Sequence, residues 1–219
     1  MTMPDKERVV LYCDRMLLAC LCFLVFFLPF AKAGVEICVW MAVFFWMVKR
    51  MAGYRTGTKP GLLPATELNK AIGIFVAVNA LTILVSVDAG LSVRAFFGKI
   101  VKFVLIYFIT VETVNSKKRL KNILMVIVLS SVLIIADAGA QYFLGKDFLR
   151  GFVFSRLSAS FGSANGFAGW LVMMVFILLG ALGWGYRRGS TRRGRSLFLA
   201  LLVLLLSTCF VVTSSRGAW

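Results

Sequence analysis

Runs of mostly apolar residues recur along the chain, and short segments rich in charged residues, glycine and serine separate them. A helix needs about 20 predominantly apolar residues to cross the hydrocarbon core of a bilayer. The pattern therefore predicts an all-α, polytopic helical membrane protein whose residues 1–219 form a single transmembrane domain. We place about seven spans, at residues 11–30, 34–48, 71–87, 96–114, 122–144, 165–185 and 196–214.

Two of the breaks between spans contain recognisable residues. Pro29, Lys32 and Gly34 interrupt what would otherwise be one overlong helix, because proline and glycine disfavour a helix interior. We therefore expect a tight hairpin between the first two spans. After the third span, Asp88 is expected to cap a helix or form a turn, since its side chain can accept a hydrogen bond from the first N–H groups of a helix.

The composition supports a membrane protein. Hydrophobic residues make up 60% of the chain and the mean hydropathy is +0.90, whereas soluble domains contain about 45–50% apolar residues. The five cysteines lack the spacing of a zinc site, and the chain has no histidine. We therefore expect no metal site and no cofactor, and the usual general base near neutral pH is missing.

Lysine and arginine are unevenly distributed between the connecting segments. With the N-terminus in the cytoplasm, 17 of the 25 basic residues lie on the cytoplasmic side. This distribution follows the positive-inside rule, so it predicts a cytoplasmic N-terminus. It also explains most of the net charge of +16. We therefore interpret RRGSTRRGR, at residues 187–195, as a stop-transfer segment instead of a nucleic-acid patch, and expect no nucleic-acid partner.

The eight remaining basic residues lie on the outer side, against this bias. Lys99 and Lys102 stand three residues apart inside the fourth span. Together with Arg94 they would occupy an arc of about 140° on an α-helix. Two interpretations stay open: the lysines reach out to the lipid headgroups, or they form a cationic site for an anionic ligand.

Asp137 and Gln141 form a second polar face, one helical turn apart in the fifth span. Side chains at this spacing lie on the same side of a helix. They can make a hydrogen bond between helices or an ion pair with Lys99 or Lys102, or they can support a site at the outer membrane face.

The loop after the fifth span reads GKDFLRGFVFSRLSASFGSANG, residues 145–166. Its mixture of basic and aromatic residues, which includes Arg156, is typical of the headgroup layer. Asn165 is a possible N-cap of the next span. The N–H groups at a helix N-terminus can also bind an anion.

Several of these residues, taken in order, resemble the N-terminal half of the O-antigen ligase and polymerase family of bacterial polysaccharide membrane proteins. In that family a Gln-Tyr pair late in one span precedes an arginine, a GTFGNPN-like loop and a further span, and the next span closes on Ser-Arg-Gly. The matching residues here are Gln141, Tyr142, Arg156, Ser160, Phe161, Gly162, Asn165, Ser215, Arg216 and Gly217.

The resemblance implies a multi-pass protein of the bacterial inner membrane that transfers or polymerises glycan from an undecaprenyl diphosphate carrier at the outer face. The implied partners are membrane lipids, the undecaprenyl diphosphate-linked glycan and an acceptor glycan such as lipid A-core. The implied diphosphate-binding residues are Arg216, Arg156, Lys102, Lys99 and Arg94. The implied supporting polar residues are Asp137, Gln141, Asn165 and Ser215.

The second half of the family, with a large outer loop that carries a catalytic histidine, has no counterpart in this sequence. We therefore assign no catalytic residue, and expect a truncated bundle that is the N-terminal part of a larger enzyme and is inactive by itself. Two other classes stay open. One is a small-solute or bicarbonate-type transporter, which solute uptake into proteoliposomes tests directly. The other is a non-catalytic membrane scaffold.

Overall fold

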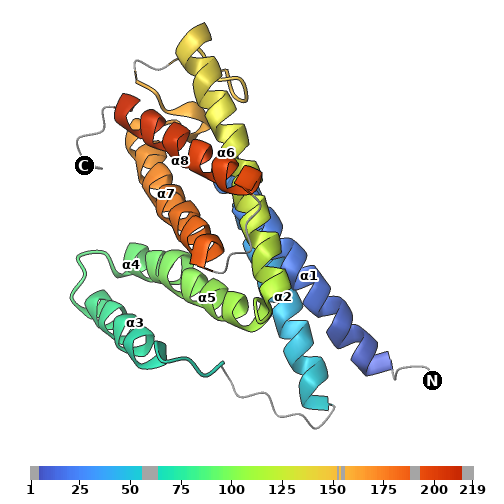
Figure 1. Cartoon of the computed structure of the whole chain (residues 1–219). Helices are drawn as coiled ribbons and strands as arrows, with labels where there is room; N and C mark the ends of the chain where they lie inside the picture. The colour runs from blue at the N-terminus through green and yellow to red at the C-terminus, as the bar shows by residue number, and fades with distance from the viewer. Residues whose placement is uncertain (1–4, 56–63, 152, 154–155, 188–192, 214–219) are drawn as a thin grey trace. The chain divides into compact units, whose positions relative to one another are not determined.

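The computed structural model describes residues 5–55, 64–151, 153, 156–187 and 193–213, and every regular element in these ranges is helical (Figure 1). The all-α prediction is therefore confirmed for the described residues. In chain order the elements are α1 (Asp5–Phe27), α2 (Lys32–Arg55), α3 (Asn69–Leu84), α4 (Ala89–Ala95), the π-helix η1 (Phe96–Val101), α5 (Lys102–Thr113), α6 (Lys117–Leu144), the 3-10 helix η2 (Ala159–Phe161), α7 (Ala164–Arg187) and α8 (Arg193–Val212).

In the part of the chain that the structure describes, three helices are long and apolar enough to cross a membrane. They are Arg8–Phe27 of α1, Lys117–Leu144 and Ala164–Trp184 of α7. By the length and composition of these helices, the chain is a multi-pass membrane protein. The apolar stretches Asn69–Leu84 and Ser196–Val212 are shorter. Each of the seven expected spans overlaps a helix, but seven membrane crossings stay a prediction.

The break between the first two expected spans is confirmed. Helix α1 ends at Phe27, two residues before Pro29, and α2 begins at Lys32. The backbone N–H groups of Phe30 and Ala31 both donate to the Phe27 carbonyl oxygen, at 3.0 and 2.9 Å. A proline disfavours the helical conformation of the residue before it, so Pro29 accounts for the end of α1, three residues before the expected end of the first span. Lys32 and Gly34 were expected to contribute to the break, but both lie inside α2.

The helix of the expected fourth span begins earlier than predicted. Asp88 is the N-cap of α4, and its side chain accepts a hydrogen bond from the backbone N–H of Leu91 at 2.9 Å. The predicted cap is therefore confirmed. From Ala89 the chain is helical without interruption to Thr113, through the π-helical segment Phe96–Val101. Arg94 consequently belongs to the same continuous helix as the two lysines.

The helices form two compact units, which we describe separately. Unit 1 comprises Met1–Leu24 with Ala33–Asn122, and unit 2 comprises Val25–Lys32 with Ile123–Trp219. In unit 1, the core lies between α1, α2 and α5. Leu17, Ala42 and Ile109, one from each helix, are fully buried there. Burial of such side chains stabilises the packing by about 1.5–3 kcal/mol for each large residue.

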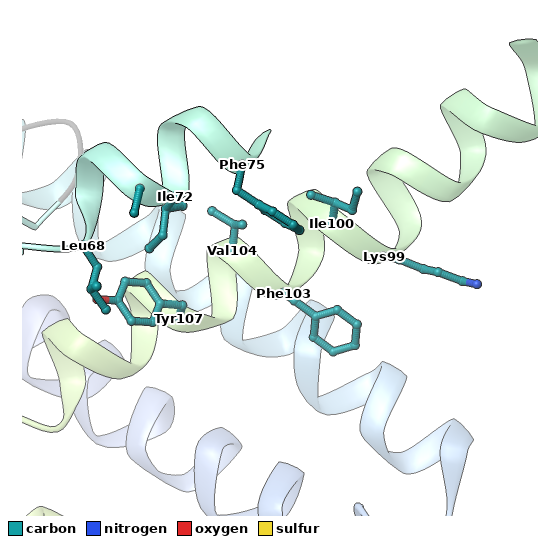
Figure 2. A pocket seen from close by; sticks show the side chains of 9 residues that line it. Leu68, Ile72, Phe75, Lys99, Ile100, Phe103, Val104 and Tyr107 are labelled. Atoms are coloured by element: carbon teal, nitrogen blue, oxygen red, sulfur yellow. The ribbon is translucent and has the colours of Figure 1, made fainter. Parts of the chain in front are cut away.

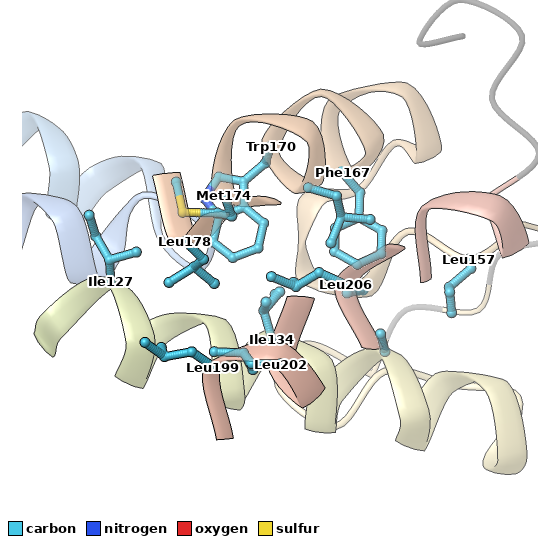
Figure 3. Packing of buried hydrophobic residues seen from close by; sticks show 13 residues of the cluster. Ile127, Ile134, Leu157, Phe167, Trp170, Met174, Leu178, Leu199, Leu202 and Leu206 are labelled. Atoms are coloured by element: carbon cyan, nitrogen blue, oxygen red, sulfur yellow. The ribbon is translucent and has the colours of Figure 1, made fainter. Parts of the chain in front are cut away.

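The core of unit 2 lies between α6, α7 and α8 (Figure 3). On α7 the buried side chains Phe167, Leu171, Met174 and Leu178 recur every three or four residues. This spacing gives a helix one continuous apolar face. Helices α7 and α8 lie side by side in Figure 1 and pack closely. Ala159 of η2 is also part of this core, so the loop before α7 is anchored to the helices.

Candidate functional site

Asp137 is a buried acid near the C-terminal end of α6, with 3% of its surface exposed. One carboxylate oxygen, Oδ1, accepts hydrogen bonds from the backbone N–H groups of Phe148 at 2.8 Å and Leu149 at 3.2 Å. The other, Oδ2, accepts from the Ser160 hydroxyl at 2.5 Å. Buried charges must be paired or hydrogen-bonded, and here three neutral donors from the following loop satisfy the carboxylate.

Gln141 lies one turn after Asp137 and is 5% exposed. Its Oε1 accepts from the backbone N–H groups of Ser158 at 3.0 Å and Ala159 at 2.7 Å, and its Nε2 donates to the Ser158 hydroxyl at 3.4 Å. The four residues Asp137, Gln141, Ser158 and Ser160 form one buried set, which we call the polar anchor. The predicted polar face is therefore real, but it binds the loop and not a second helix.

The backbone at Ala159 is unusual. Its φ angle is +44°, in the left-handed region that residues with a Cβ rarely occupy. Gln141 holds this conformation through its hydrogen bond to the Ala159 N–H. Gly145 ends α6 with φ +74°, and its N–H donates to the Gln141 carbonyl oxygen at 3.0 Å. Glycine adopts this conformation at the end of a helix without steric cost.

The polar anchor leaves basic side chains on the surface of the loop. Arg156 is exposed, two residues before the anchored Ser158. Arg150 is also exposed, and its guanidinium donates to the carbonyl oxygen of Phe30. The only acid of the loop, Asp147, is buried and accepts a hydrogen bond from the backbone N–H of Arg150 at 2.7 Å. The exposed charge of the loop is therefore positive.

The prediction that Asn165 caps the sixth span is wrong. Helix α7 begins at Ala164, so Asn165 lies in its first turn. Ser163 precedes the helix, and its hydroxyl accepts from the backbone N–H of Gly166 at 3.2 Å. The cap is Ser163 instead of Asn165 because Gly162, with φ +70°, ends the 3-10 helix η2 one residue before Ser163. A serine at this position caps a helix as well as an asparagine does.

The expectation that Lys99 and Lys102 share one helix face is also wrong. The π-helical segment contains more residues per turn than an α-helix, because its hydrogen bonds join residue i to residue i+5. The two side chains are consequently directed to different neighbours. Lys102 donates to Glu36 of α2 at 2.6 Å and lies over the ring of Phe103. Its charge is thus neutralised within unit 1.

Lys99 lies at the edge of a groove of about 600 Å³ between α3 and the continuous helix formed by η1 and α5. The groove is lined by Leu68, Ala71, Ile72, Phe75, Lys99, Ile100, Phe103, Val104 and Tyr107. Figure 2 shows that the ammonium end of Lys99 points away from these apolar side chains. Both Lys99 and Arg94 are exposed. These two cations therefore face outwards, without the convergence that a closed anion site requires.

Unit 1 contains an ion-pair cluster that the sequence analysis did not identify. Glu112 of α5 pairs with Lys49 at 3.0 Å and Arg50 at 2.7 Å, and accepts from the indole N–H of Trp46 at 2.8 Å. Three donors from two turns of α2 thereby hold the end of α5. Because the Glu112 side chain is only 22% exposed, these contacts are partly shielded from water.

Asp14 of α1 extends the same cluster. Its carboxylate pairs with Lys49 at 2.9 Å and with Arg119 in the first turn of α6. Burial lowers the pKa of the Lys49 ammonium, but its hydrogen bonds to Asp14 and Glu112 and their negative charges raise it more, so the pKa lies above its usual value. The sequence signal was the presence of acids inside spans, close to strongly basic connections.

Two of the expected site residues, Ser215 and Arg216, lie outside the described residues. Within the described ranges, no group of three or more cysteine, aspartate or glutamate side chains could hold a metal ion. Comparison with protein-family models, with curated proteins and with solved structures finds no match for this chain. The functional argument therefore rests on the geometry of the chain itself.

Proposed function

We propose that this chain is part of a membrane glycosyltransferase of the O-antigen ligase type. Such a protein transfers or polymerises glycan from an undecaprenyl diphosphate carrier at the outer face of the inner membrane. In this proposal the chain crosses the membrane seven times and its N-terminus is cytoplasmic. The excess of basic residues in alternate connections supports this orientation, and the overlap of each expected span with a helix supports the number of crossings.

The observation that carries the proposal is the polar anchor. Asp137 and Gln141 were singled out as supporting polar residues, and both bind the loop that contains Arg156. Residues that match the family pattern at separate points of the sequence thus belong to one buried hydrogen-bonded set. Binding sites are commonly carried by loops that a rigid scaffold positions. The anchor supplies that scaffold for Arg156.

Arg156 has the chemistry that a diphosphate requires. Its guanidinium is planar and permanently charged, and it can donate two parallel hydrogen bonds to phosphate oxygens. When the bond between the glycan and the carrier breaks, negative charge develops on the departing diphosphate, and a fixed cation stabilises it. Arg216, on the outer side in the predicted topology, is proposed as a second contact. Lys102 is a weaker candidate because Glu36 already neutralises it.

Carrier binding can be measured on this chain by itself. The purified protein in detergent is incubated with undecaprenyl diphosphate or undecaprenol, and the retained lipid is quantified by native mass spectrometry. We expect the diphosphate to be retained in preference to the alcohol. Arg156→Gln should lower retention of the diphosphate by about tenfold, which equals about 1.4 kcal/mol and is close to one hydrogen bond to a charged group.

Lys121→Gln is the charge-matched control. Lys121 is an exposed cation in the N-terminal part of α6, far along the helix from the polar anchor. We expect this variant to retain the diphosphate as the wild type does. An equal loss in the two variants would mean that the total charge attracts the lipid, and equal retention of diphosphate and undecaprenol would rule out a diphosphate site. Either result contradicts the proposal.

A further inference from the structure

Unit 2 contains a groove of about 540 Å³ beside the C-terminal half of α6, which we call the α6 groove. This volume is in the usual range of small-molecule sites, about 300–1,000 Å³. Its lining comes from the end of α1 and the turn after it, from α6, and from the loop after α6. The lining residues are Phe26, Phe27, Phe30, Leu133, Ala136, Asp137, Ala140, Phe148 and Leu149.

The inside of the α6 groove suits an apolar occupant. Among the described residues that line it, Asp137 is the only one with a polar side chain. Both oxygens of that carboxylate already accept hydrogen bonds, from two backbone N–H groups and from Ser160. A polar ligand inside the groove would therefore gain little in exchange for its lost hydration. Phenylalanine, leucine and alanine side chains instead offer a surface for a hydrocarbon chain.

The position of the α6 groove in the sequence places it where hydrocarbon gives way to headgroups. Phe26 and Phe27 are the last residues of one candidate membrane span, and Ala136 and Ala140 lie in the last three turns of another. Phe148 belongs to the loop that follows that span. Aromatic side chains gather at this level of a bilayer. The occupant is therefore expected to have an apolar chain and a polar end.

The polar end of the occupant can be identified from the charge at the rim. Arg150 directly follows the lining residues Phe148 and Leu149, and its guanidinium donates to the carbonyl oxygen of Phe30, a third lining residue. Lys146, in the same loop, is exposed, whereas Asp147 is buried. An anionic headgroup is complementary to this basic rim, because a guanidinium can donate two parallel hydrogen bonds to a phosphate.

We propose that the α6 groove binds one acyl chain of an anionic phospholipid, and that the phosphate of this lipid contacts Arg150. The groove shares Asp137, Phe148 and Leu149 with the support of the loop that contains Arg156, but the proposal does not depend on carrier binding by Arg156. The bound lipid would cover the apolar lining and neutralise the basic rim. In doing so it would hold the end of α1 against α6 within unit 2.

The test compares an anionic and a zwitterionic phospholipid, which differ in the headgroup and have the same acyl chains. The purified full chain in detergent is incubated with phosphatidylglycerol or phosphatidylcholine of the same acyl composition, and native mass spectrometry counts the lipids retained. We expect one phosphatidylglycerol to be retained in preference to phosphatidylcholine. Ala136→Trp fills the α6 groove and should lower retention of phosphatidylglycerol about tenfold, or about 1.4 kcal/mol. Val132→Trp is the control, because Val132 is exposed on α6 and does not line the groove.

Arg150→Gln tests the headgroup contact separately. Glutamine is polar but has no charge, so we expect it to abolish the preference for phosphatidylglycerol. Lys121→Gln should keep that preference.

If Ala136→Trp does not fold, Ala140→Leu adds less bulk to the same lining and should also reduce retention of phosphatidylglycerol. Equal retention of the two lipids by the wild type would overturn the proposal, as would unchanged retention in the folded groove variants. A preference for undecaprenyl phosphate that Ala136→Trp abolishes and Arg156→Gln leaves unchanged would overturn it too, because the carrier would then occupy the α6 groove.

Discussion

Two acidic side chains, Glu112 in unit 1 and Asp137 in unit 2, are removed from water in different ways. Glu112 is bound mainly by the cations Lys49 and Arg50 of α2. Asp137 is bound by two backbone N–H groups and the Ser160 hydroxyl, and makes no ion pair with any described residue. The first arrangement joins two helices, whereas the second attaches a loop to a helix.

The two kinds of contact differ in how precisely they fix the position of the group that they bind. A cation on a long side chain can reach a carboxylate from many directions, so an ion pair restrains a helix end only loosely. A backbone N–H has a fixed direction, so the two N–H groups bound to Asp137 determine the path of the chain at Phe148 and Leu149. The polar anchor is therefore the more suitable support for a binding site, which needs fixed geometry.

Removal of the Asp137 carboxylate should have the largest effect. Asp137→Ala leaves two backbone N–H groups and one hydroxyl without their acceptor, and each buried unsatisfied group costs about 1–3 kcal/mol. We expect the free energy of unfolding, measured by thermal unfolding in detergent, to fall by about 3 kcal/mol. We also expect faster proteolysis within residues 145–163. Asp137→Asn keeps an acceptor oxygen and should lose only about 1 kcal/mol.

Asp88→Ala is the control for this prediction. It removes an exposed acid that caps a helix, and should cost about 1 kcal/mol without a change in proteolysis of residues 145–163. If Asp137→Ala is no more destabilised than Asp88→Ala, the polar anchor does not hold the loop.

Removal of the Glu112 carboxylate should have a smaller effect. Breaking a fully buried ion pair costs about 3–5 kcal/mol, but water partly reaches Glu112, so we expect about 2 kcal/mol for Glu112→Ala. Salt screens partly exposed charges. High salt should therefore reduce the difference in free energy of unfolding between the wild type and Glu112→Ala. The corresponding difference for Asp137→Ala should not change. The same salt response in both variants would remove the distinction drawn between the two sites.

The smallest effect is expected at Ala159. Ala159→Gly relieves a left-handed backbone conformation that costs about 1–2 kcal/mol, but removes a buried methyl group that contributes about 0.8 kcal/mol. The two effects nearly cancel, so the free energy of unfolding, measured by thermal unfolding, should change by less than about 0.5 kcal/mol. The control Ala138→Gly alters an equally buried alanine inside α6. It loses the methyl group and about 1 kcal/mol of helix propensity, so it should be clearly destabilised.

Helix positions were largely predictable from the sequence, because an apolar run of membrane length has few alternatives to a helix. The break at Pro29 and the cap at Asp88 were predictable for the same reason, since each depends on residues next to it in the chain. The directions of the Lys99 and Lys102 side chains were not predictable. The expectation that they share one helix face assumed a regular α-helical period, and the π-helical segment changes that period.

The candidate site was predictable only in part. The spacing of Asp137 and Gln141 placed them on one side of a helix, but no local rule names the partners of a buried polar group. Those partners, Ser158 and Ser160, are up to 23 residues away along the chain. The ion-pair cluster around Asp14 was missed for the same reason, because its contacts join residues up to 105 positions apart.

The sequence by itself determined that this is an all-helical, multi-pass membrane protein, because hydrophobicity and helix period act over neighbouring residues. Only the tertiary structure decided what the charged and polar side chains do. It directs Lys102 to Glu36, joins Asp14 and Glu112 to Lys49, and turns Asp137 and Gln141 towards the loop that carries Arg156. The physical reason is that a buried polar group must find a partner, and which partner it finds depends on how distant segments pack.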